Sequence, residues 1–156
     1  MSDRENFFGV IRNFQSAMLV SRRTGGSLHV RPMAVAEIKE DGDTIFATNI
    51  ASPKIAEIAN DPNVLLTFQD GSKFASLIGR ARFLRDQAEI DRLWSETWRV
   101  WFPKGKDDPA LCLLTIDAQA GWYWDNAGLK GLKYVLESIK GCRNRNNSSR
   151  GRQTAR

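Results

Sequence analysis

The chain contains several short stretches in which apolar and polar residues alternate, and this period of two predicts β-strands. The alternation is clearest from Leu28 to Ile38. Pro32 lies inside this stretch and cannot donate to a ladder, so we expect an edge, a bulge or an interruption there, with backbone groups left for a ligand. Gly79 predicts a bulge or a close approach in another strand. The further strands predicted are at residues 17–22, 45–47, 64–69, 74–84, 111–117 and 121–125.

Apolar residues at helical spacing predict helices at about residues 3–14, 53–60, 86–98 and 129–139. The second is the best defined, because Ser52 stands at the N-cap position and Pro53 at the first helical position. Asp70-Gly71 with Ser72 predicts a hairpin loop. Short, mostly consecutive antiparallel strands with a few helices indicate an α+β or barrel fold.

The net charge of +5 is concentrated at the C-terminus. Residues 143–156 contain five arginines and no acidic residue, and without them 18 basic residues face 18 acidic ones. We therefore expect one domain at residues 1–141 and a basic, disordered tail at residues 142–156. Such a tail can touch nucleic acid non-specifically, but nucleic-acid binding is not the expected function.

The chain has no apolar run long enough to span a membrane and no apolar signal core near its start, which predicts a cytoplasmic protein. Cys112 and Cys142 lack metal-ligand spacing, so we expect reduced thiols, with Cys112 in the core of a strand. No metal site is expected. The single His29 has no evident nucleophile to serve, and no catalytic residue is assigned.

The stretch from Thr48 to Lys54 combines features suited to an anion. A helix N-terminus offers N–H groups and a positive dipole end. Thr48 and Ser52 add hydroxyl groups, and Lys54 adds a positive charge, which predicts a phosphate cradle. The alternative is an ordinary capped helix with a solvated lysine.

Flat apolar side chains and a strand interruption complete this pattern. Arg31 and Met33 flank Pro32 on one strand face. A ligand with a phosphate and a planar ring would use these residues, the cradle and the aromatic side chains together. The alternative for Trp122 and Trp124, which alternate on one strand face, is a place in the core or in an interface. The aromatic residues concerned are Trp101, Phe102, Trp122 and Trp124.

Five motifs follow one another along the chain: Arg31-Pro32-Met33, Phe46-x-Thr48-x3-Ser52-x-Lys54, Asp61-Pro62-x-Val64, Gly79-x-Ala81, and Trp101-Phe102-Pro103-x-Gly105 followed by Asp108-Pro109. With these motifs in this order, the chain resembles the pyridoxamine 5′-phosphate oxidase-like FMN-binding split-barrel superfamily, most closely its general stress protein branch. The resemblance covers about residues 3 to 125, most of the chain.

The resemblance implies a mainly β, α+β fold: a six-stranded antiparallel split β-barrel with flanking helices. It also implies a homodimer with two flavin sites at its interface, holding FMN, with FAD as the alternative. Residues matching Arg31 and Lys54 bind the FMN phosphate in that family, assisted by those matching Thr48, Ser52 and the neighbouring Asn49. The segment containing Pro32 and Met33 follows the isoalloxazine ring. Phe102 and Trp124 match aromatic residues that close the site.

Departures from the true oxidases qualify the function that the resemblance implies. Pro53 and Phe74 stand where those enzymes carry an arginine and a glutamine, and their Arg/His substrate motif has no match after Asp125. We therefore expect a flavin-binding general stress protein with weak or unknown redox activity, and no efficient oxidation of pyridoxamine 5′-phosphate. The alternative is a flavin-dependent oxidoreductase or flavin reductase that uses NAD(P)H or another small substrate.

Overall fold

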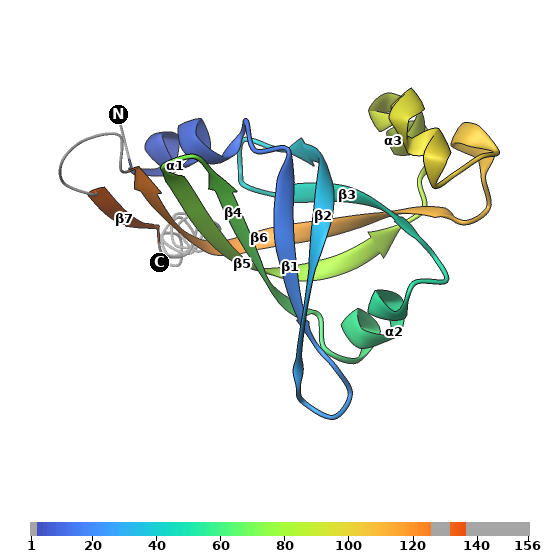
Figure 1. Cartoon of the computed structure of the whole chain (residues 1–156), viewed down its shortest axis with the longest axis horizontal. Helices are drawn as coiled ribbons and strands as arrows, with labels where there is room; N and C mark the ends of the chain where they lie inside the picture. Colours follow the sequence, from blue (N-terminus) through green and yellow to red (C-terminus); the bar gives the residue numbers. More distant parts are fainter. Residues whose placement is uncertain (1–2, 126–131, 137–156) are drawn as a thin grey trace, which may run out of the picture.

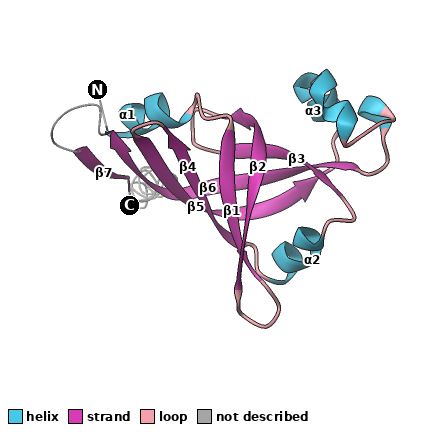
Figure 2. Cartoon of the chain, viewed as in Figure 1, coloured by secondary structure: helices cyan, strands magenta, loops and turns pink. Residues whose placement is uncertain are grey.

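The computed structural model describes residues 3–125 and 132–136, which form a closed antiparallel β-barrel with helices at its margins (Figures 1 and 2). The strands are β1 (Ser16–Arg22), β2 (Leu28–Ile38), β3 (Thr44–Asn49), β4 (Asn63–Asp70), β5 (Lys73–Leu84), β6 (Leu111–Asp125) and β7 (Leu132–Leu136). The α-helices are α1 (Asp3–Ile11), α2 (Pro53–Asn60) and α3 (Gln87–Leu93), and the 3-10 helices are η1 (Glu96–Val100) and η2 (Gly105–Asp107).

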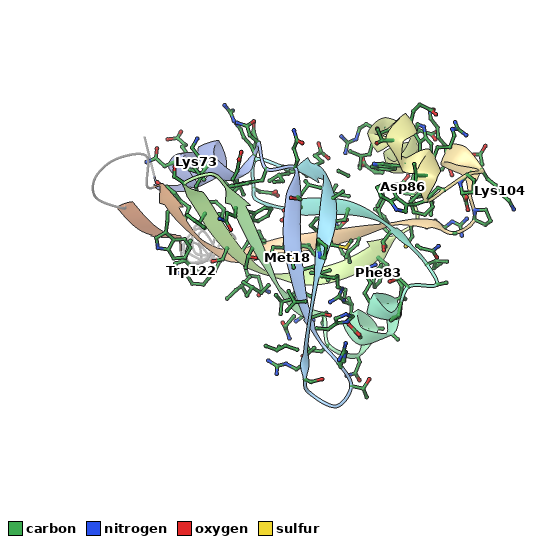
Figure 3. All side chains as sticks on the ribbon, in the orientation of Figure 1. Met18, Lys73, Phe83, Asp86, Lys104 and Trp122 are labelled. Carbon is green, nitrogen blue, oxygen red and sulfur yellow. The ribbon has the colours of Figure 1, made fainter. Side chains whose placement is uncertain are left out.

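The sheet order is β3-β2-β1-β4-β5-β6-β7, and a further pairing of β3 with β6 closes six strands into the barrel. This confirms the predicted six-stranded antiparallel split barrel. The seventh strand extends the sheet beyond the barrel by pairing with β6. Lys73 and Trp122 lie toward the end of the molecule near α1, and Asp86 and Lys104 lie at the other end, near α3 (Figure 3).

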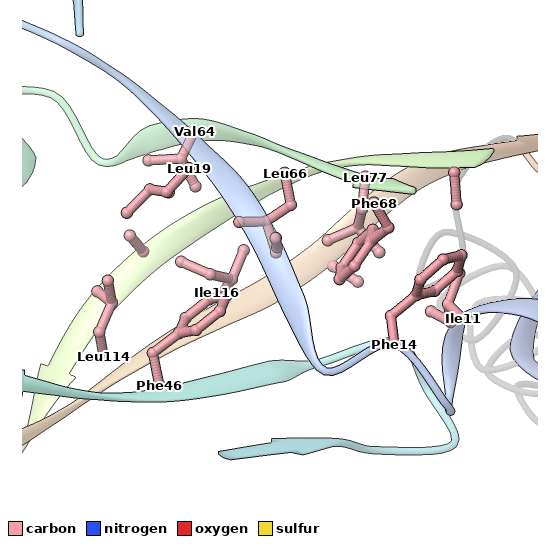
Figure 4. Close-up of a cluster of buried hydrophobic side chains, with 14 of the residues drawn as sticks. Ile11, Phe14, Leu19, Phe46, Val64, Leu66, Phe68, Leu77, Leu114 and Ile116 are labelled. Carbon is pink, nitrogen blue, oxygen red and sulfur yellow. The ribbon is translucent and has the colours of Figure 1, made fainter. Parts of the chain in front are cut away.

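The barrel interior is filled by the inward-facing residues of the strands, together with Ile11 of α1 and Phe14 of the segment after it (Figure 4). Phe46, Leu66, Leu77 and Leu114 are wholly buried there. Helix α1 packs on the barrel through Phe7, whose ring lies 6.1 Å from that of Tyr123. A second cluster beneath α3 and η1 contains Ile45, Ile90, Trp98, Phe102, Leu111 and Leu113.

Two local predictions about glycine are confirmed. The β5–β6 register shifts between Ile78 and Gly79, which marks the expected bulge. A Cβ at Gly79 would lie 2.5 Å from the backbone oxygen of Asp117, so only glycine fits this approach. The β4–β5 hairpin turns through Gly71 and Ser72, with φ of 56° at Gly71.

Two predictions at the C-terminal side are wrong: the break between two strands and the helix that follows them. The strands expected at 111–117 and 121–125 form one continuous strand, β6, because the residues between them also pair with β5. Within the helix expected at 129–139, the described residues Leu132–Leu136 form β7 instead. A short apolar run fits both periods, and the exposed edge of β6 supplies the hydrogen bonds that decide between them.

Smaller differences concern the first helix and the tail. Helix α1 ends at Ile11, although Phe14 beyond it is still buried. The tail, including Cys142, lies outside the described residues. Within the described ranges, each α-helix is too short and too polar to cross a lipid bilayer.

Candidate functional site

The candidate site lies where β2 and β3 separate. In the described part of the chain, Val35, Glu37 and Ile38 of β2 pair with β3, whereas residues 28–34 pair with β1. A bulge between Val35 and Glu37 accompanies the separation. The Val35 N–H donates to the Gln15 carbonyl on the β1 side, so by alternation Pro32 directs its nitrogen the other way, toward the split. The missing N–H of Pro32 therefore costs the ladder nothing.

A cavity of about 380 Å³ occupies this split, within the range of small-molecule sites. One wall comes from β2, the opposite wall from β3 and the start of α2, and the third from the aromatic residues of η1 and the loop after it. The lining residues are Pro32, Met33, Ala34, Ala47, Thr48, Asn49, Ser52, Lys54, Trp98, Trp101 and Phe102.

The Lys54 ammonium group is held at this cavity by two hydroxyl groups. Its Nζ donates to Thr48 Oγ1 and to Ser52 Oγ, each at 2.8 Å. An ammonium group has three N–H donors, so these two bonds leave one for a ligand. Burial lowers the pKa of Lys54, and the nearby charge of Arg31 lowers it further. The group is thus a partly desolvated, oriented cation.

Ser52 occupies the predicted N-cap position of α2, but its side chain makes no capping hydrogen bond. Its Oγ accepts from Lys54 instead, which turns a common helix cap into part of a cation-holding cradle. Asn49 shapes the preceding loop: its Oδ1 accepts from the Ala51 N–H at 2.8 Å, and its backbone oxygen accepts from the Ser52 N–H.

The aromatic wall contains one exposed and two buried side chains. Trp98 and Phe102 are buried in the second cluster, which fixes their position. Trp101 is 62% exposed at the cavity, an unusual solvent exposure for so large an apolar side chain. From the sequence, Trp98 is expected on a helix face and is not among the predicted site residues. Its spacing of three from Trp101 could have revealed it, because such residues eclipse in a 3-10 helix.

The cavity brings together seven of the nine residues named from the sequence: Pro32, Met33, Thr48, Asn49, Ser52, Lys54 and Phe102. Arg31 is not among its lining residues. Its guanidinium donates to the His29 carbonyl, the Ser21 hydroxyl and the Glu57 carboxylate, at 2.9, 2.8 and 3.1 Å. No pattern in the sequence indicated this contact with Glu57.

Trp124 also lies away from the cavity of its own chain. It pairs with Phe74 and Lys133 near the end of β6, on the side of the molecule where Trp122 lies (Figure 3). A role for Trp124 in closing a site would therefore require a second copy of the chain.

Cys112 is a free thiol buried in β6, opposite Thr48 of β3. Burial raises the pKa of this thiol, although the charges of Lys54 and Arg85 oppose the rise. It is a core residue behind the cradle, as predicted. Among the described residues, no three side chains of the metal-binding kinds gather into a site.

The geometry suits a ligand with an anionic group at one end and a flat apolar group at the other. The anion would meet Lys54 and the N-terminus of α2. The flat group would lie between the strand β2 and the aromatic wall of Trp98, Trp101 and Phe102.

Comparison with solved structures supports a relationship across most of the chain. The general stress FMN/FAD binding protein from Xanthomonas citri is 32% identical, with a TM-score of 0.67 over 85% of this chain and 96% of that one. General stress protein 26 from Bacillus anthracis shares the fold at 23% identity, with a TM-score of 0.72 over 86% of this chain and 100% of its own.

A pyridoxamine 5′-phosphate oxidase-related, FMN binding protein from Nostoc punctiforme shares the fold at 13% identity, with a TM-score of 0.61 over 86% of each chain. Curated proteins gave no match. The model of the family described as pyridoxamine 5′-phosphate oxidase like matches residues 2–147. The chain therefore belongs to the pyridoxamine 5′-phosphate oxidase-like family.

Proposed function

We propose that this protein binds a flavin mononucleotide in the split between β2 and β3, with the flavin phosphate at Lys54. The observation that carries the proposal is the Lys54 ammonium group, oriented by Thr48 and Ser52 at a cavity with an aromatic wall. The Xanthomonas citri relative, described as an FMN/FAD binding protein, supports a flavin as the ligand. A bound flavin would supply electron and hydride transfer chemistry.

Flavin titration tests this proposal. We expect FMN to bind with quenching of its fluorescence, and mass spectrometry of the purified protein to identify the flavin that accompanies it. FAD is the alternative ligand, and competition between the two flavins ranks them. A protein that quenches neither flavin would contradict the proposal.

We also propose that two copies form the complete flavin site. The outer face of the barrel carries an apolar row that runs across five strands: Val30, Val20, Leu65, Ile78 and Ala120. Val30 is 52% exposed and Ile78 39% exposed, and the neighbouring Met18 is 37% exposed. A continuous apolar face of this kind is typical of an interaction surface.

A second copy is the occupant that this face fits best. Met18 pairs with Pro32, and Pro32 lines the cavity, so the apolar face is continuous with the proposed flavin site. From Met18 a second, neighbouring row crosses the sheet through Thr67 and Ser76 to Trp122. The cavity walls leave the split open to solvent, where Trp101 is exposed, and a partner chain on this face would cover a ring bound there.

Val30→Lys tests the dimer, because a lysine on this face makes association costly without changing the barrel interior. We expect sedimentation to show monomers and FMN affinity to fall. A monomeric variant that binds FMN as tightly as the unmodified protein would overturn the shared site.

The proposed biological role is that of a flavin-binding general stress protein with weak redox activity, in line with its similarity to the general stress proteins. Steady-state assays with NADH or NADPH as electron donor test the proposed weak redox activity separately from flavin binding. Rapid, repeated reduction of the bound flavin would favour a flavin reductase instead.

A further inference from the structure

A buried polar cluster lies beside the cradle, between α2 and the β1–β2 hairpin. The Glu57 carboxylate accepts a hydrogen bond from Ser21 Oγ at 2.8 Å and from Arg31 Nη2 at 3.1 Å, and lies 2.9 Å from His29 Nδ1. The Glu57 and Arg31 side chains are only 12% and 14% exposed, and Ser21 is buried. Charges so poorly solvated interact strongly with one another.

The cluster holds Arg31 by three contacts. One Nη group donates to the His29 carbonyl, and the other donates to Ser21 and Glu57. Ser21 therefore accepts from Arg31 while it donates to Glu57, which closes a ring of hydrogen bonds. This ring fixes the guanidinium against α2, outside the set of residues that line the cavity.

Arg31 and Glu57 both act on the cradle through their charges. After burial, the Arg31 charge is the largest influence that lowers the pKa of Lys54, and the Glu57 charge opposes it. Glu57 follows Lys54 by three residues on α2, so the two side chains belong to neighbouring turns. Glu57 therefore opposes the effect of Arg31 at the cradle, and Lys54 is the cation that lines the cavity.

We propose that Glu57 limits the preference of the cradle for phosphorylated flavins, because it pairs with Arg31 and holds it away from the cavity. Glu57 acts here as a positioning residue, since it reaches the ligand only through Arg31 and the electrostatic potential at Lys54. The inference rests on the proposed flavin function and adds a residue that limits phosphate affinity.

Glu57→Gln is the direct test. Glutamine keeps the shape of the side chain, and its amide oxygen can still accept from Arg31 and Ser21, while the negative charge is lost. We expect the dissociation constant for FMN to fall by about three- to tenfold, the scale of one partly screened charge near a phosphate. Riboflavin lacks the phosphate, so its dissociation constant should not change.

Glu40→Gln is the matched control, because Glu40 is an exposed carboxylate in the turn between β2 and β3. Glu40→Gln changes the net charge by the same amount as Glu57→Gln, and it should leave the dissociation constants for FMN and riboflavin unchanged. Arg31→Gln should change the FMN affinity in the opposite direction. Glu57 then lacks its cationic partner, so FMN affinity should fall while riboflavin affinity stays constant. This second variant keeps the inference testable if Glu57→Gln does not fold.

The outcomes separate the inference from the proposed function. Equal changes for FMN and riboflavin, with a lower melting temperature, would show that the cluster is purely structural and would overturn the inference. Calorimetric titration with inorganic phosphate probes the cradle without a flavin. Tighter phosphate binding by Glu57→Gln would support the inference even in a protein that binds no flavin, whereas unchanged phosphate and FMN binding would refute it.

Discussion

Replacing Lys54 by methionine should weaken FMN binding and spare riboflavin. The substitution keeps most of the aliphatic stem and removes the ammonium group, which is the cation that Thr48 and Ser52 orient at 2.8 Å. A hydrogen bond to a charged group contributes about 1.5–3 kcal/mol. Such a loss corresponds to an increase of about 10- to 150-fold in the dissociation constant.

The structure indicates a loss of binding free energy in the lower half of this range. Both hydroxyl groups accept from Lys54 and become available when the ammonium group is removed. They can then donate to a phosphate themselves and replace part of the lost interaction. We therefore expect a loss of about 1.5–2 kcal/mol, or about 10- to 30-fold in the dissociation constant for FMN.

Fluorescence-quenching titrations with FMN and riboflavin measure both affinities on one protein sample. Lys73→Met is the matched control, because Lys73 is an exposed lysine at the start of β5, far from α2 (Figure 3). It should leave both affinities unchanged. If Lys54→Met weakened riboflavin as much as FMN, Lys54 would not contact the phosphate and the cradle would be misassigned.

Three further predictions concern the aromatic wall, the barrel and the buried cluster. Trp101→Ala should weaken FMN and riboflavin equally, by about 0.5–1.5 kcal/mol in the same titrations, because the two flavins share the ring. Gly79→Ala should lower the free energy of unfolding in urea by about 1–3 kcal/mol, because a Cβ meets the Asp117 backbone. Burial raises the pKa of Glu57, but bonds from His29 and Ser21 and the Arg31 charge hold it below its ordinary value. The stability that Glu57 adds relative to Glu57→Gln should therefore be complete above about pH 4.3 and disappear as pH falls through the lower folded-state pKa; an unchanged difference at acid pH would contradict this.

The sequence predicted the cradle because its residues are close together along the chain. Ser52, Pro53 and Lys54 are consecutive, and Thr48 is the next-to-last residue of the strand that leads to them. Local geometry therefore places the hydroxyl groups near the ammonium group. The bulge at Gly79 was predictable for the same reason, since a glycine inside a strand pattern marks a local irregularity.

Contacts between distant residues could not be predicted in this way. The surroundings of Arg31 depend on Glu57, 26 residues away on a helix whose rotation about its axis no sequence pattern specified. The strand β7 depends on the free edge of β6, which exists only once the barrel has closed. In both cases tertiary contacts decide between local alternatives that the sequence leaves nearly equal.

Glu57 combines two effects on the cradle that different substitutions separate. Its hydrogen bonds to β1 and β2 anchor α2, the helix that carries Lys54, and its charge offsets that of Arg31. Ser21→Ala removes the bond that Ser21 donates to Glu57 and the bond that it accepts from Arg31, and leaves every charge in place. Glu57→Gln instead removes the charge and can retain the bonds. If anchoring positioned Lys54, Ser21→Ala would impair FMN binding and Glu57→Gln would not improve it. Electrostatic control of phosphate binding predicts the reverse order of effects, because a phosphate interacts with the total charge around it and not with the rigidity of one helix.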